Sequence, residues 1–281
     1  MSALSQRDRQ LWTDQGFFRI NGFVDPAVGQ EMLDRVIELV RLASTGDDIS
    51  PALVLPEQQP SLAKGGLPEL DASKVFRVAD AEPFRSFSTR EGVTAVAAEL
   101  IGGGDIDCFL SQFIFKNPGA WGQPWHQDSY YFPFDPPRPV VGVWLAVTEA
   151  TLENGCLHVL PGSHSEPIHE HKPDRRVGAN YGYVEIVDHD MDGCQPVLME
   201  PGDLLVFDSH LMHRSTDNVS PGLRAAMVFH FAAAGTMDRT EELRGYTVNH
   251  WLPVRRNGGL PGGRVSPQGS SGSYVPSMSS D

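Results

Sequence analysis

The stretch PGDLLVFDSHLMHRSTDNVSPGLRAAMVFHF, residues 201–231, contains two apolar runs joined by a polar segment. A Pro-Gly-Asp turn precedes the first run, and Arg224 opens the second. His210 and His213 stand between the two runs. Because short apolar runs bounded by turn residues are typical of β-strands, this stretch predicts two strands with polar residues between them.

Short apolar runs bounded by turn residues also occur between Gly104 and this stretch. The part of the chain before Gly104 contains sequence signals of helix ends instead. Ser5-x-x-Asp8 and Ser88-x-x-Glu91 resemble capping boxes, and Asp25-Pro26 is typical of a helix start. Helices first and strands afterwards predict a mainly β fold, a sandwich or barrel with helices packed outside it. The further predicted strands are CFLSQFIF (108–115), VVGVWLAV (140–147), CLHVLPG (156–162) and PVLMEPGDLLVFD (196–208).

The length of 281 residues suits one domain, which we place at residues 1–256. Residues 257–281 are rich in Gly, Ser and Pro, and we expect this tail to be disordered. Residues 45–72 are rich in Gly, Pro, Gln and Asp, which predicts a long surface loop of the kind that often forms a lid.

The composition excludes some classes of partner. A formal net charge of −14 would repel nucleic acid and anionic lipid. We find neither a signal peptide nor an apolar run of about 18 residues, so we expect no membrane partner. Three widely spaced cysteines favour a reducing compartment, and we expect a cytoplasmic location. The oligomeric state stays open.

A second polar constellation lies in QPWHQDSYYF, residues 123–132. In extended backbone, His126 and Asp128 point to the same side and can converge on one metal ion, although the motif alone also suits a solvated turn. Two histidines and one carboxylate leave open positions for a co-substrate and O₂, as in non-haem Fe(II) oxygenases. Arg224, at the start of a buried strand, suits a ligand carboxylate; the alternative is a side chain that reaches solvent.

The order His126-x-Asp128, His213 and Arg224 resembles the phytanoyl-CoA dioxygenase family. HQDSYYFPFDP, VWLAVTEATLENGCLHVLPGSH and HRSTDNVSPGLR also resemble family segments, across residues 105–232, as does the N-terminal DQGFFRINGFVD. The resemblance implies a double-stranded β-helix, that is, a jelly-roll, cupin-like barrel. It also implies Fe(II), with 2-oxoglutarate and O₂ as co-substrates.

The resemblance further assigns roles to individual residues. His213 rather than His210 matches the second histidine ligand, and we expect His210 to be a hydrogen-bonded support. The metal ligands and catalytic residues would be His126, Asp128 and His213. The 2-oxoglutarate site would contain Arg224, Ser215, Trp144, Lys74 and Gln112.

The substrate is not named by these motifs. Tyr130, Tyr131 and Phe132 suggest an aromatic wall for the substrate. Arg214 replaces a glycine common in the family, so it could narrow the pocket, contact an acidic substrate or face solvent. In SHSEPIHEHKPDRR, residues 163–176, we expect a solvated loop rather than a second metal site.

The expected reaction is hydroxylation of a C–H bond of a small organic substrate, with decarboxylation of 2-oxoglutarate to succinate. The presence of Asp128 favours hydroxylation over halogenation. Few basic residues, chiefly Lys172, Arg175 and Arg176, could bind CoA phosphates, so we favour a small, apolar or mildly polar metabolite. The alternatives are an acyl-CoA 2-hydroxylase, a non-catalytic sensor that binds metal and 2-oxoglutarate, and a zinc hydrolase.

Overall fold

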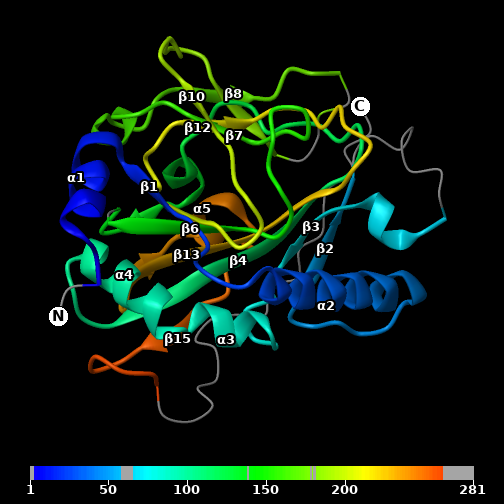
Figure 1. Ribbon diagram of the computed structural model, residues 1–281, viewed down its shortest axis with the longest axis horizontal. Helices are drawn as coiled ribbons and strands as arrows, with labels where there is room; N and C mark the ends of the chain where they lie inside the picture. The colour runs from blue at the N-terminus through cyan, green and yellow to red at the C-terminus, as the bar shows by residue number, and fades with distance from the viewer. Residues whose placement is uncertain (1–2, 58–65, 138, 178, 180–181, 262–281) are drawn as a thin grey trace.

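The computed structural model describes residues 3–57, 66–137, 139–177, 179 and 182–261. Its largest sheet has eight antiparallel strands. They are β1 (Phe17–Ile20), β2 (Leu53–Pro56), β3 (Ala72–Phe76), β4 (Ile106–Lys116), β6 (Val140–Ala146), β11 (Leu204–Asp208), β13 (Arg224–Ala233) and β15 (Leu252–Arg255). The order is β1-β11-β6-β13-β4-β3-β2, and β15 also pairs with β4 (Figure 1).

A smaller sheet faces the large one. It contains β10 (Gln195–Val197), β7 (Leu157–Val159) and β12 (His213–Ser215), in that order. One apolar cluster joins side chains of β6, β11 and β13 to side chains of β7 and β10, so the two sheets pack face to face. This is the jelly-roll barrel expected from the sequence. Two short pairs complete the strands: β5 (Phe134–Asp135) with β14 (Met237–Asp238), and β8 (His171–Pro173) with β9 (Val184–Ile186).

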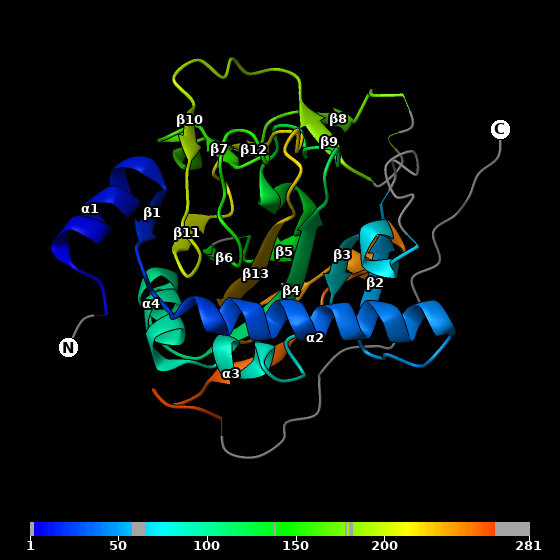
Figure 2. The ribbon, with the colours of Figure 1, turned by 45° about the vertical axis from the view of Figure 1, so that its right-hand side comes forward.

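Helices α2 (Pro26–Thr45), α3 (Phe84–Ser88) and α4 (Glu91–Ile101) cover the outer face of the large sheet, opposite the small one (Figure 2). Ser5 and Asp8 form the predicted capping box, and the Asp25 side chain caps the second helix. The capping box at Ser88 was wrong, because Ser88 ends a short helix and its hydroxyl donates to the carbonyl of Arg85. The helices are α1 (Gln6–Gln15), α2 (Pro26–Thr45), α3 (Phe84–Ser88), α4 (Glu91–Ile101) and α5 (Thr240–Arg244), with 3₁₀ turns η1 (Pro68–Asp71), η2 (Asp128–Tyr131) and η3 (Ser163–Ser165).

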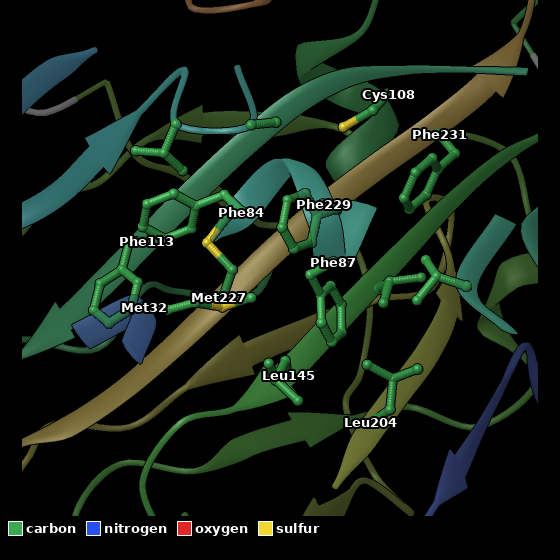
Figure 3. Packing of buried hydrophobic residues seen from close by; sticks show 14 of the residues in the cluster. Met32, Phe84, Phe87, Cys108, Phe113, Leu145, Leu204, Met227, Phe229 and Phe231 are labelled. Atoms are coloured by element: carbon green, nitrogen blue, oxygen red, sulfur yellow. The ribbon is translucent and has the colours of Figure 1, made fainter. Parts of the chain in front are cut away.

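The central strands are apolar because both of their faces are buried. On β13, Met227 and Phe229 point towards the helices, where the ring of Phe229 stacks on Phe87 of α3 at 5.5 Å between ring centroids (Figure 3). The alternate residues Ala226 and Val228 face the small sheet. Alternation along each strand therefore separates a helix-side core from the barrel interior.

The prediction of a loop over residues 45–72 was wrong in part. Thr45 ends α2, β2 is an edge strand of the large sheet, and η1 leads into β3. The sequence of β2 is LVLP, and its apolar side chains stabilise the strand at the edge of the large sheet, although the flanking residues are mostly polar. Residues 58–65, like residues 262–281 of the predicted disordered tail, lie outside the described residues. No described helix has the length and apolar character needed to cross a bilayer.

Gly142 of β6 lies directly beneath the ring of Phe207, its cross-strand partner on β11. A Cβ atom at Gly142 would overlap this ring, and both residues are buried. We therefore expect Gly142→Ala to lower the free energy of unfolding by about 1–3 kcal/mol, measured by denaturant titration. The matched control is Gly92→Ala in α4, where the added Cβ would make only ordinary contact with Phe23. An equal free energy of unfolding for the two variants would contradict the close contact between Gly142 and the Phe207 ring.

Candidate functional site

The two histidines of the predicted metal site are brought together by the backbone. The amide of His126 donates to the carbonyl of His213 at 2.9 Å, and the amide of His213 donates back at 3.0 Å. Asp128 follows two residues later, at the start of η2. Residues 126 and 213, far apart in the chain, therefore sit side by side at the mouth of the barrel.

The side chains of this triad converge. The Nε2 atoms of His126 and His213 lie 3.3 and 3.7 Å from Oδ1 of Asp128. Each histidine places its Nδ1 within 2.9 Å of a backbone carbonyl, at Pro124 and Leu211 respectively. Since a carbonyl only accepts hydrogen bonds, Nδ1 carries the hydrogen and Nε2 offers a lone pair towards Asp128. Three ligand atoms within 4.8 Å of one another can hold one metal ion.

The protonation states also suit metal binding. Burial, followed by the neighbouring His126, lowers the pKa of His213 to about 4, so its ring is neutral near pH 7. Burial raises the pKa of Asp128, but the neighbouring rings of His213, His126 and His230 outweigh burial and hold this pKa well below its usual range. A neutral imidazole and an ionised carboxylate are the forms that bind metals.

His230 supports Asp128 and was not predicted as a site residue. Its Nε2 lies 2.7 Å from Oδ2 of Asp128, the carboxylate oxygen that is not shared with the triad histidines. The ring of Phe207 packs edge-on against both His230 and His213. The signal was present in the sequence, because His230 stands six residues after Arg224 and an even spacing along one strand keeps the same face.

His210 is buried but does not join the triad. Its amide donates to Oδ1 of Asp208 at 2.8 Å, and its carbonyl accepts a hydrogen bond from Nε2 of Gln127 at 2.9 Å. The supporting role expected for the His210 side chain stays a prediction.

Beyond the triad, Arg224 lies in the barrel interior and is only 2% exposed. Its Nη2 donates to the carbonyl of Gly155 at 3.0 Å, while Nε and Nη1 have no hydrogen-bond partner among the described residues. The guanidinium lies 5.7 Å from the ring of Trp144. Burial lowers the pKa of Arg224 to about 10, which still leaves it charged near pH 7. A buried charge with free donors is costly unless an anion binds there.

Lys116 is a second buried cation at this position, and the sequence reasoning missed it. It is the cross-strand partner of Arg224, and its Nζ donates to Oγ of Ser215 at 2.8 Å. Burial and then the charge of Arg224 lower the pKa of Lys116 well below its usual value. The signal was a lysine at the end of an apolar strand, but which strand would pair with β13 was not evident from the sequence.

The triad and the two cations line one cavity of about 190 Å³. Asp128 is the one carboxylate among its described lining residues, against four cations, Lys74, Lys116, Arg224 and Arg244. The cavity therefore favours anionic ligands. Of the other predicted residues, those that line it are Gln112, Tyr131, Phe132, Trp144 and Ser215.

Two predicted substrate residues lie elsewhere. The ring of Tyr130 stacks on His171 at 4.3 Å between centroids and does not line the cavity, because the η2 turn points it away from Tyr131. Arg214 lies over the ring of Trp125 and lines a neighbouring surface cleft, because neighbouring residues of β12 point to opposite faces. Neither residue lines the cavity that contains the triad, and the position of Arg214 suits the expected alternative in which its side chain faces solvent.

Arg244 was also missed by the sequence reasoning. It lies at the end of α5, lines the cavity and donates from Nη2 to the carbonyl of Tyr130. Its guanidinium also lies 5.1 Å above the Tyr130 ring. Nothing in its local sequence distinguishes it from an ordinary surface arginine at a helix end.

The sequence is similar to known proteins over most of its length. A model of the phytanoyl-CoA dioxygenase (PhyH) family matches residues 12–226. The peroxisomal phytanoyl-CoA dioxygenase of Bos taurus is 29% identical over 241 residues, which cover 83% of this chain and 70% of that protein. The 2-aminoethylphosphonate dioxygenase of an uncultured bacterium (HF130_AEPn_1) is 26% identical over 232 residues, covering 81% of each chain.

Solved structures share the fold. A crystal structure of EctD from S. alaskensis with 2-oxoglutarate and 5-hydroxyectoine superposes with a TM-score of 0.63 and 19% identity. The match covers 83% of this chain and 77% of that chain. At this identity the likeness establishes the shared jelly-roll architecture.

The triad geometry gives a direct test of the ligand set. We expect His213→Ala to lose one equivalent of bound Fe(II) or Co(II), because the substitution removes a nitrogen that faces Asp128. The matched control His210→Ala should keep its metal, since the His210 side chain lies outside the triad. Anaerobic isothermal titration with each variant measures the stoichiometry. Equal metal loss from both variants would show that the second histidine was wrongly chosen.

Proposed function

The chain belongs to the phytanoyl-CoA dioxygenase family, and we infer from this membership that it is a non-haem iron dioxygenase that uses 2-oxoglutarate as co-substrate. His126, Asp128 and His213 would hold the iron. When bound, the iron would couple decarboxylation of 2-oxoglutarate by O₂ to the transfer of one oxygen atom to a substrate C–H bond. The donor set fits this ion, because two neutral imidazoles and one carboxylate leave open positions.

The observation that carries the proposal is Arg224. Its Nε and Nη1 lack partners among the described residues, and it lies in the same cavity as the triad. The free Nε–H and Nη1–H groups can donate charge-assisted hydrogen bonds to a carboxylate that binds beside them. Arg224 and the hydroxyl of Ser215 would bind the distal carboxylate of 2-oxoglutarate, and a negative charge there would also stabilise Lys116. A zinc hydrolase gives no role to this pair of cations.

The other cavity residues would position the co-substrate. Trp144 would form one wall of its site, next to Arg224. Lys74 lies with Nζ 3.2 Å from Oε1 of Gln123, so it would be held towards the cavity, with Gln112 on the neighbouring strand. Asp128 would occupy the carboxylate position of the metal, which favours hydroxylation over halogenation.

We favour a small, apolar or mildly polar substrate over an acyl-CoA. Pockets for drug-sized ligands measure about 300–1,000 Å³, whereas this cavity has about 190 Å³ and must also hold the co-substrate. The side chains left for a substrate include Leu53, Leu55, Tyr131 and Phe132. They form a compact and largely apolar surface.

The basic residues that could receive CoA phosphates are already paired. Arg176 lies 2.6 Å from Asp174, and Arg175 lies 3.4 Å from Glu185. Lys172 lies 3.2 Å from Glu170. These ion pairs support the preference for a substrate without CoA, and they weaken the alternative of an acyl-CoA 2-hydroxylase. A cytoplasmic location and the absence of nucleic-acid and membrane partners stay part of the proposal.

Replacing Arg224 tests the co-substrate site. We expect Arg224→Ala to weaken 2-oxoglutarate binding at least about tenfold, since a hydrogen bond to a charged group contributes about 1.5–3 kcal/mol. Quenching of tryptophan fluorescence in the anaerobic metal complex reports binding, because Trp144 lies beside the guanidinium. Arg214→Ala is the matched control and should bind normally, since Arg214 lines another cleft. Unchanged affinity of Arg224→Ala would make Arg224 structural.

Substrate class is tested by pairs of compounds that differ only in the CoA group. Free acids and their CoA thioesters are incubated with Fe(II), 2-oxoglutarate and O₂, and hydroxylated product is measured by mass spectrometry. We expect the thioesters to be the poorer substrates. Preferential hydroxylation of thioesters that collapses in Arg175→Ala/Arg176→Ala would restore the acyl-CoA alternative.

A further inference from the structure

A second group of ligand atoms lies outside the cavity, in the segment between β7 and β10. Oε2 of Glu166 lies 2.9 Å from Nε2 of His169 and 3.2 Å from Nε2 of His189. All three ligand atoms lie within 4.8 Å of one another. The side chains are partly buried, and none of them lines the cavity of the triad. The segment expected to be a solvated loop thus brings three possible metal ligands together.

Both ring nitrogens of His169 face a carboxylate. Nε2 lies 2.9 Å from Oε2 of Glu166, and Nδ1 lies 3.3 Å from Oδ1 of Asp188. Because a neutral imidazole carries one N–H, it leaves a ring lone pair facing one of these carboxylates, and a metal ion bound between the two groups would remove that repulsion. A carboxylate behind a histidine is also the arrangement that orients metal-bound imidazoles.

We propose that Glu166, His169 and His189 form a second metal site, for a zinc-like divalent ion. Two imidazoles and one carboxylate are a common zinc ligand set, with water completing four-fold coordination. Tetrahedral coordination with bonds of about 2.0–2.1 Å separates ligand atoms by about 3.3 Å. The distances of Glu166 Oε2 to the two imidazole nitrogens, 2.9 and 3.2 Å, are close to this separation.

The site is structural rather than catalytic, because it fixes a segment that supports the triad. Glu166 and His189 stand at the two ends of the segment that contains the β8–β9 hairpin. The amide of His169 donates to Oε1 of Gln127 at 2.9 Å, and Nε2 of Gln127 donates to the carbonyl of Pro167 at 3.0 Å. Gln127 stands between His126 and Asp128 in the chain. A metal ion at the second site would thus hold the hairpin against the backbone that carries two triad residues.

The proposal is tested by counting zinc in protein that carries no polyhistidine tag. After zinc loading and desalting, we expect two equivalents in the wild type by elemental analysis. Glu166→Ala and His169→Ala should each retain one equivalent, and His213→Ala should also retain one. Glu170→Ala is the matched control: it removes an exposed carboxylate from the same segment and should retain two. Anomalous diffraction from zinc-loaded wild-type crystals should place one ion between Glu166, His169 and His189 without any substitution.

Different results separate this inference from the proposed enzyme function. One equivalent in the wild type that persists in Glu166→Ala and disappears in His213→Ala would overturn the second site and leave the triad intact. Anomalous density at the triad but none between His169 and His189 would also overturn it. Loss of one equivalent in Glu166→Ala but none in His213→Ala would support the second site and reject the triad.

Discussion

The central strand β13 is buried on both faces, and this constraint decides the role of each of its residues. Met227 and Phe229 pack against the helices, while Arg224 and His230 project into the barrel interior with Ala226 and Val228 between them. The cation and the supporting histidine are thus held at a fixed separation by one rigid strand. Helix packing on one face of the strand therefore determines which side chains face the site on the other.

The fold was largely predictable from the sequence, because its strands are apolar and separated by turns. Signals at element ends were less reliable. Ser88 matches a capping box, yet its hydroxyl bonds within the preceding helix, since a serine hydroxyl serves either partner. The edge strand β2 was missed because four residues in a polar context do not give a clear alternating pattern.

The candidate site was predictable where spacing along one strand or a family motif determines the position. Lys116 and His230 were missed for a different reason: each acquires its role from a cross-strand or tertiary neighbour. Tyr130 and Tyr131 are adjacent in sequence but face different surroundings, because the η2 turn directs one ring to His171 and the other to the cavity. Such assignments need the turn geometry, which composition does not supply.

The guanidinium of Arg224 has N–H groups without a hydrogen-bond partner among the described residues, so the stability of the fold depends on the concentration of the anion that binds there. A ligand that binds only the folded chain adds RT ln(1 + [L]/Kd) to the free energy of unfolding, about 2.7 kcal/mol at one hundred times Kd. An anion at Arg224 and Lys116 would also offset the burial and the repulsion by Arg224 that lower the pKa of Lys116. The free energy of unfolding would therefore rise with the concentration of the anionic co-substrate, so that the enzyme is most stable where its co-substrate is abundant.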